Sequence, residues 1–160
     1  MSTSYGDRPD LLPSRAVRFT LLPSGGCGWV PREGVTFLTH DEHRRLEQAA
    51  LGALPRRPDA TVDWTRCADL VVRSRPALPS AGAEEVRHLT PLATSLVLVP
   101  GSLAVPSIRV APEVASEVAH DMVSRSTELW VLSEPLGVVV EYAYFHDSLV
   151  TARVVDATGR

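Results

Sequence analysis

The chain has 160 residues, a formal net charge of −3, and 44% hydrophobic and 22% charged residues. These values are typical of one globular domain, and the acidic balance argues against the basic field that generic nucleic-acid binding requires. The sequence contains no Lys and no Asn, which excludes P-loops, kinase-type ATP sites, Schiff-base chemistry, Cys-His-Asn proteases and N-glycosylation.

The sequence also indicates a compartment. Its N-terminal residues lack the apolar core of a signal peptide, and apolar runs such as residues 96–99 are too short to span a bilayer. We therefore expect a cytoplasmic protein without membrane association. All the basic residues are Arg, which indicates a high-GC bacterial genome, and the isolated Cys27 and Cys67 predict two free thiols.

The first part of the chain predicts little regular structure. Residues 1–14 have no hydrophobic periodicity and predict a mobile tail, followed by a single α+β domain over residues 15–158. Strands are expected at residues 16–22 and 35–38. The Gly-rich turn between them, residues 23–28, lacks the glycine spacing of a dinucleotide-binding loop.

The strongest helix signal follows. Thr39 and Glu42 have the spacing of a capping box, so a helix is expected to begin there and to end near Leu54, before a proline. His40 and His43 are neighbours on this helix, but no third ligand follows from the spacing and the His-Glu-x-x-His pattern is absent. We therefore expect no metal site.

The middle of the chain predicts a second helix at residues 64–74, capped by Asp63, then a linker-like loop at residues 76–82 and a short helix at residues 83–89. Residues 95–99 form a nearly continuous apolar run. Such a run predicts a central strand that is buried on both faces.

A strand at residues 103–110 is expected to lie at a sheet edge or to carry a bulge, because Pro106 cannot donate a ladder hydrogen bond. Pro112 then begins a helix that ends at Arg125. The outward face of this helix carries Glu113, Glu117, His120 and Asp121. This acidic stripe is a candidate docking surface for a basic partner, with pH dependence supplied by His120.

The C-terminal third predicts a three-stranded antiparallel meander over residues 128–133, 137–145 and 149–155. A type I turn is expected between the first two strands, with Gly137 in the left-handed conformation. In this register Trp130 lies opposite Tyr142 on the core face.

A three-residue loop in the second hairpin places Phe145 opposite Leu149 and Glu141 opposite Arg153. Val138, Val140, Tyr142 and Tyr144 then form a core face. Glu141 and Arg153 are candidates to orient an anionic or polar ligand, and His146, in the hairpin loop, is a candidate catalytic or binding side chain. No Gly-x-Ser-x-Gly elbow or cofactor motif is present, so no catalytic residue is assigned and no cofactor is expected.

These signals predict an α+β fold, in which an antiparallel sheet with a C-terminal three-stranded meander is packed by two to four amphipathic helices. From Ala83 onward the element order is similar to parts of profilin-like and longin-like domains, many of which are interaction modules; the similarity lies in element order alone and assigns no family. The favoured function is an accessory or regulatory protein that binds a protein partner or a second copy of itself, without catalysis. The alternative is a small cofactor-independent acid–base enzyme (lyase, isomerase or hydrolase) with a pocket between the meander and a helix.

Overall fold

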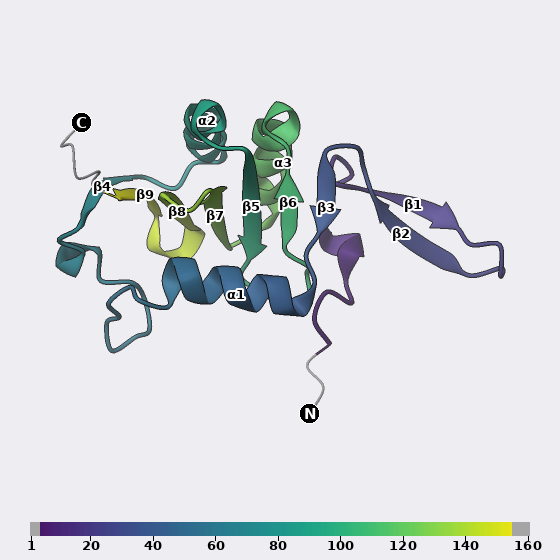
Figure 1. Ribbon diagram of the computed structural model, residues 1–160, viewed down its shortest axis with the longest axis horizontal. Coiled ribbons are helices and arrows are strands. Elements are labelled where there is room, and N and C mark those ends of the chain that lie inside the picture. Colours follow the sequence, from purple (N-terminus) through teal and green to yellow (C-terminus); the bar gives the residue numbers. More distant parts are fainter. Residues whose placement is uncertain (1–3, 155–160) are drawn as a thin grey trace.

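The structure, a computed structural model, describes residues 4–154. Within them, three α-helices and nine strands form an α+β fold with one seven-stranded antiparallel sheet and one two-stranded hairpin (Figure 1). The strands are β1 (Val17–Leu21), β2 (Cys27–Pro31), β3 (Val35–Phe37), β4 (Leu70–Arg75), β5 (Ser95–Pro100), β6 (Ile108–Val110), β7 (Glu128–Glu134), β8 (Val138–Ala143) and β9 (Ser148–Val154). The helices are α1 (His40–Leu51), α2 (Pro79–Leu89) and α3 (Pro112–Arg125).

The large sheet has the order β3-β6-β5-β7-β8-β9-β4, and helices cover both of its faces. Helices α2 and α3 lie side by side on one face, and α1 crosses the other (Figure 1). The hairpin of β1 and β2 projects from the end of the molecule next to β3. The predicted α+β class and the C-terminal meander are therefore confirmed.

Strand β5 explains why two cores form. Its alternate residues point to opposite faces, so that Leu96 and Leu98 join the core beneath α2 and α3, while Val97 and Val99 join the core beneath α1. All four are buried. The prediction of a central strand that is buried on both faces is confirmed.

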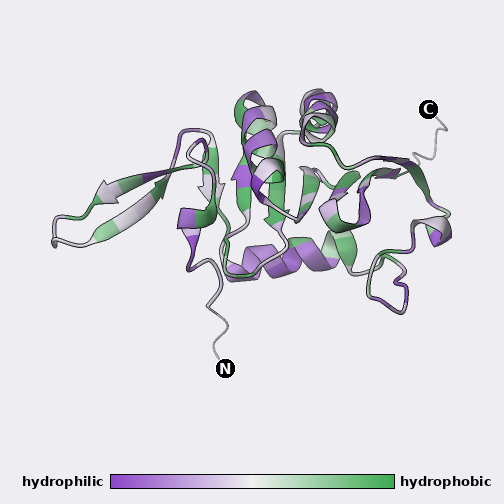
Figure 2. Ribbon diagram, turned by 180° about the vertical axis from the view of Figure 1, so that it is seen from behind, coloured by the Kyte–Doolittle hydropathy of each residue, from purple (hydrophilic) through white to green (hydrophobic). Residues whose placement is uncertain are grey.

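Helix α1 begins with the predicted capping box. Thr39 Oγ1 accepts a hydrogen bond from the Glu42 backbone N–H at 3.2 Å, and Glu42 Oε2 accepts one from the Thr39 N–H at 2.8 Å. The helix ends at Leu51, earlier than the expected Leu54, and Gly52 is its C-cap. Most of the α1 ribbon has the hydrophilic colour in the hydropathy-coloured view (Figure 2).

Two predictions for the middle of the chain are wrong. Residues 64–74 do not form a helix, because Asp63 caps only a single 3-10 turn, η2 (Trp64–Arg66), and the following β-branched residues pair with β9 as the edge strand β4. The linker-like residues 76–82 instead contain the start of α2, with Pro79 in its first turn. Gly82 permits α2 to approach α3 closely, since a Cβ there would lie 3.3 Å from Val123 Cγ2.

Part of the segment that was predicted to be a mobile tail, residues 1–14, contacts the rest of the chain. Gly6 N–H donates to the Leu103 carbonyl at 2.9 Å, the Tyr5 hydroxyl accepts from the Ser107 N–H at 2.9 Å, and Leu12 is buried in the core. Residues 5–12 therefore pack onto the domain, whereas residues 1–3 and 155–158 lie outside the described part. Pro106 precedes the short strand β6, which is paired on both sides and is not an edge.

The first hairpin of the meander is shifted by one residue from the predicted register. Trp130 lies opposite Glu141 and faces α1, while Val131 lies opposite Val140. The Ser133 hydroxyl accepts hydrogen bonds from the Gly137 and Val138 N–H groups and closes the turn, which contains a cis peptide bond before Pro135. Gly137 does not take the expected left-handed conformation.

The second hairpin is shifted by three residues. Glu141 lies opposite Val150, and Arg153 lies opposite Val138. The cause is a longer loop: residues 144–146 form a 3-10 turn, η4 (Tyr144–His146), and Asp147 turns the chain with φ of 45°. Val138, Val140 and Tyr142 are buried as predicted, but Tyr144 is exposed and does not belong to the core. Val155 lies outside the described residues.

No helix in the described part of the chain is long and apolar enough to cross a membrane. Cys27 and Cys67 are both free thiols, one exposed and one partly buried.

Candidate functional site

The β1–β2 hairpin has one entirely apolar face. Residues opposite each other on paired strands point to the same side, so the pairs Val17–Pro31, Phe19–Trp29 and Leu21–Cys27 form this face. The other side carries Arg18, Thr20, Gly28 and Val30. We call the first set the hairpin face: Val17, Phe19, Leu21, Cys27, Trp29 and Pro31.

The hairpin face extends from the core into solvent. Val17 is buried in the core beneath α3, whereas Phe19 is 52% and Leu21 74% exposed further along the arm. The Phe19 and Trp29 rings contact edge to face with centroids 5.5 Å apart. Hydrophobic segments occur in both strands of the projecting arm (Figure 2). The sequence prediction missed β2, because its Gly, Cys and Pro residues interrupt the alternation of apolar and polar residues that indicates a strand.

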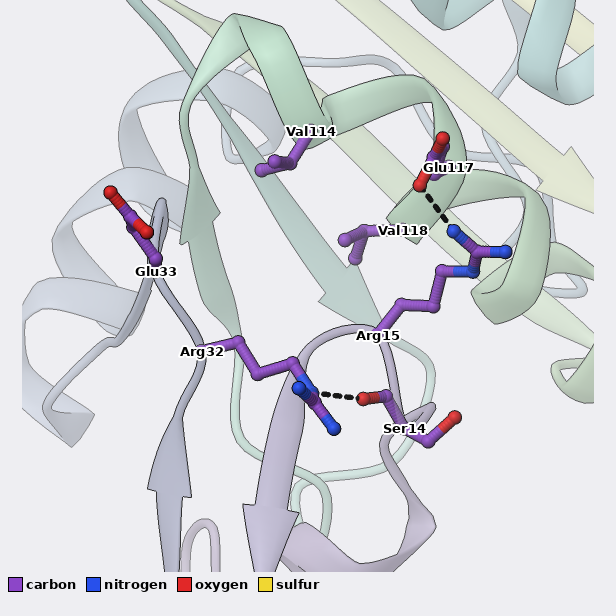
Figure 3. A pocket seen from close by; sticks show the side chains of 7 residues that line it. All are labelled: Ser14, Arg15, Arg32, Glu33, Val114, Glu117 and Val118. Atoms are coloured by element: carbon purple, nitrogen blue, oxygen red, sulfur yellow. Dashed lines mark hydrogen bonds and ion pairs between the residues drawn. The ribbon is translucent and has the colours of Figure 1, made fainter.

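A groove lies at the base of the arm, between the hairpin and α3 (Figure 3). Its volume is about 460 Å³. Arg15 extends along the groove to α3, where it pairs with Glu117 and, at 3.5 Å, with Asp121. On the side of the groove opposite α3, Arg32 Nε donates a hydrogen bond to the Ser14 carbonyl (Figure 3). The lining residues are Ser14, Arg15, Arg32, Glu33, Val114, Glu117 and Val118.

The structure places the predicted acidic stripe beside this groove. Glu113, Glu117 and His120 are exposed on the outer face of α3 and Asp121 is partly exposed. Because Arg15 neutralises part of the Glu117 and Asp121 charge, the stripe is less acidic than the sequence alone suggests. Arg15 was not recognised as a partner because 102 residues separate it from Glu117.

A second candidate site surrounds Glu141 on the α1 side of the sheet. Its Oε2 accepts a hydrogen bond from Trp64 Nε1 at 2.6 Å. The pocket has a volume of about 320 Å³, and strands β7 and β8, the loop after α1 and η4 contribute to it. The lining residues are Arg56, Asp59, Ala60, Thr61, Thr127, Glu128, Trp130, Glu141, Ala143, Phe145 and His146.

Burial raises the pKa of Glu141, and the hydrogen bond from Trp64 opposes this effect. The charge of Glu128 raises the pKa further, while Arg56 and His146 lower it. Among the described residues, no cationic nitrogen lies within the 4.0 Å of an ion pair with Glu141. The pocket thus contains a carboxyl group that ionises less readily than usual.

The structure unites only part of the predicted ligand-orienting set. Glu141 and His146 line one pocket, but Arg153 lies on the opposite face of the sheet, which α2 covers, and does not pair with Glu141. Trp64 was missed as a partner of Glu141, since no local pattern connects residues 77 positions apart.

Replacing Glu141 with Gln is expected to change how stability depends on pH. A raised pKa means that the folded protein binds this proton more tightly than the unfolded chain, so the stabilising contribution is complete below the unfolded pKa of about 4.3 and is lost as the pH rises through the folded pKa. Relative to Glu141→Gln, wild type should therefore become less stable as the pH rises from about 4 through the raised folded pKa of Glu141.

Urea unfolding across this pH range measures the effect. Gln still offers an oxygen to the Trp64 N–H, so packing is conserved. Glu113→Gln, at an exposed position on α3, is the matched control and should parallel wild type. If Glu141→Gln also parallels wild type, the carboxyl does not titrate abnormally.

The wider comparisons do not assign a family: no protein-family model matches the chain, and a search of curated proteins finds no significant similarity.

Within residues 4–154, no cluster of three or more His, Cys, Asp or Glu side chains has the arrangement of a metal site. His43, a candidate ligand in the sequence, is buried, with Nδ1 2.9 Å from Ser107 Oγ, and Tyr5 stacks on the neighbouring His40.

Proposed function

We propose that the protein is an accessory or regulatory protein that acts by binding a protein partner, and that the hairpin face is its main binding surface. The observation that carries this proposal is the continuity of the hairpin face from the buried Val17 to the exposed Phe19 and Leu21. An exposed, contiguous apolar surface is typical of an interaction site.

The free-energy cost of leaving the apolar side chains of the arm in water supports the proposal. A two-stranded hairpin is marginally stable by itself in water, and none of residues 4–154 forms a second layer over the outer half of this arm. A partner that covers Phe19, Leu21 and Trp29 would remove apolar area from water at about 25 cal/mol per Å². Aromatic residues at the centre of such a surface commonly supply much of the binding energy.

The groove at the base of the arm supplies a polar rim. Arg15 and Arg32 line it with Glu33 and Glu117, so the surface combines an apolar centre with charges of both signs. This composition suits a protein segment with one apolar face and mixed charges beside it. A second copy of this chain, joined hairpin to hairpin, meets the same requirement, because the hairpin face can be self-complementary.

The experiment uses a photo-crosslinking amino acid at position 19, with position 20 on the opposite side of the arm as the control. Position 19 should crosslink to one partner, or to a second copy, and position 20 should not. With the purified partner, or by sedimentation for self-association, Leu21→Glu should weaken binding by at least about tenfold, because a carboxylate would be buried in the interface.

Thr20→Glu carries the same charge on the other face and should change affinity by less than about twofold. Circular dichroism and thermal unfolding establish that both variants keep the fold. Equal crosslinking from positions 19 and 20, or unchanged affinity in Leu21→Glu, excludes the hairpin face as the binding surface.

One observation favours the alternative, an acid–base enzyme. Glu141 and His146 line the same pocket, and burial brings the pKa of Glu141 closer to neutrality, where a carboxyl group can both donate and accept a proton. The pocket lies between the meander and the loop after α1 rather than against a helix. Which reaction it would support depends on the ligand that enters it.

A further inference from the structure

The Glu141 pocket has an incomplete charge arrangement. Glu141 lines the pocket and is partly buried, and one of its carboxylate oxygens accepts a hydrogen bond from the Trp64 N–H. Among the described residues, no cation forms an ion pair with it. A carboxylate removed from water is costly unless an opposite charge or several hydrogen bonds compensate it. A single neutral donor compensates only part of this cost.

The pocket walls add further acidic and aromatic groups. Glu128, on β7, and Asp59, in the loop after α1, contribute carboxylates, against which Arg56 is the one permanent cation of the lining. Arg56 is partly engaged, because its Nη1 donates to the Ala60 carbonyl at 3.2 Å. Trp130 and Phe145 supply apolar surface.

We propose that this pocket binds a small organic cation, an amine or a guanidinium compound, whose charged group pairs with Glu141 and Glu128 while its apolar part lies against Trp130. The cation supplies the counter-ion that Glu141 lacks. An aromatic wall adds a favourable cation–π contribution. A volume of about 320 Å³ is at the lower end of the usual range for small-molecule sites.

The charges discriminate against other ligand classes. An anion would meet the carboxylates of Asp59, Glu128 and Glu141, and Arg56 alone does not reverse their sign. A neutral ligand would leave the Glu141 charge uncompensated. The charged or titratable residues that line the pocket are Arg56, Asp59, Glu128, Glu141 and His146.

The test uses n-butylammonium and methylguanidinium as cationic probes, with n-butanol and butyrate as neutral and anionic probes of similar size. Binding is followed by the NMR signal of the Trp64 indole N–H, which contacts Glu141 directly. The cations should shift this signal in a saturable manner, and butyrate and n-butanol should not. Affinity should increase as the pH rises and Glu141 ionises, because burial raises the pKa of this carboxyl group.

Glu141→Gln should weaken cation binding by at least about tenfold, and Glu113→Gln, outside the pocket, should leave it unchanged. If Glu141→Gln does not fold, Glu128→Gln provides the same test at the pocket wall. Equal shifts by butyrate or n-butanol, unchanged binding in the pocket variants, or no cation-induced shift overturns the proposal. The proposal is independent of the hairpin face, because Leu21→Glu should retain cation binding.

Discussion

Replacing Leu98 with Ala is expected to lower the free energy of unfolding by about 3 to 5 kcal/mol. Leu98 is 0% exposed in the middle of β5, between Ile108 of β6 and Val131 of β7. The substitution removes apolar contacts and leaves a cavity in the core beneath α3, where strands on both sides prevent the backbone from collapsing into the space.

Leu103→Ala is the matched control, since the same atoms are removed from a side chain that is 46% exposed in a loop. Its cost should remain below about 1 kcal/mol. Urea unfolding followed by circular dichroism gives both values. Similar losses for the two variants would contradict the placement of β5 at the centre of the sheet.

Arg109→Met should lower the free energy of unfolding by about 2 kcal/mol at neutral pH. The Arg109 guanidinium donates to both carboxylate oxygens of Glu134, at 2.7 and 3.0 Å, and this pair connects β6 to β7 across β5. Ser95 also donates to Glu134. Methionine fills similar volume but leaves a partly buried carboxylate without its cation.

The decrease in the free energy of unfolding caused by Arg109→Met should depend on pH. The hydrogen bonds from Arg109 lower the pKa of Glu134 in the folded state. This contribution is therefore complete above the unfolded pKa of about 4.3 and disappears as the pH falls through the folded pKa. Urea unfolding should show the difference between wild type and Arg109→Met shrinking in acid. Arg44→Met, at an exposed position of α1, should have little effect at any pH.

The sequence predicts those features that depend on neighbouring residues. The capping box at Thr39 and Glu42 identifies the start of α1, and the continuous apolar run identifies β5. The buried positions Val140 and Tyr142 also follow from simple alternation, because one strand's two faces do not depend on its partner.

The predictions that failed concern features that depend on residues distant in the sequence or on loop geometry. The predicted register of the second hairpin was wrong because the β8–β9 loop includes η4, and the sequence contains no turn motif that indicates this 3-10 turn. Residues 70–75 became a strand because β9 offers them a free edge, and such tertiary pairing overrides a helical pattern. The Glu141 site likewise requires Trp64, which only the folded chain brings near.

The position of β9 affects how the protein is made. Strand β9 lies between β8 and β4, and β4 is the edge strand of the sheet that residues 4–154 form. During synthesis on the ribosome, β4 therefore emerges more than seventy residues before β9, the strand with which it pairs. Until residues 148–154 are available, β4 and β8 both present unpaired backbone groups, the condition in which nascent chains pair with one another or bind chaperones. Completion of this half of the sheet must then wait until β9 has been synthesised.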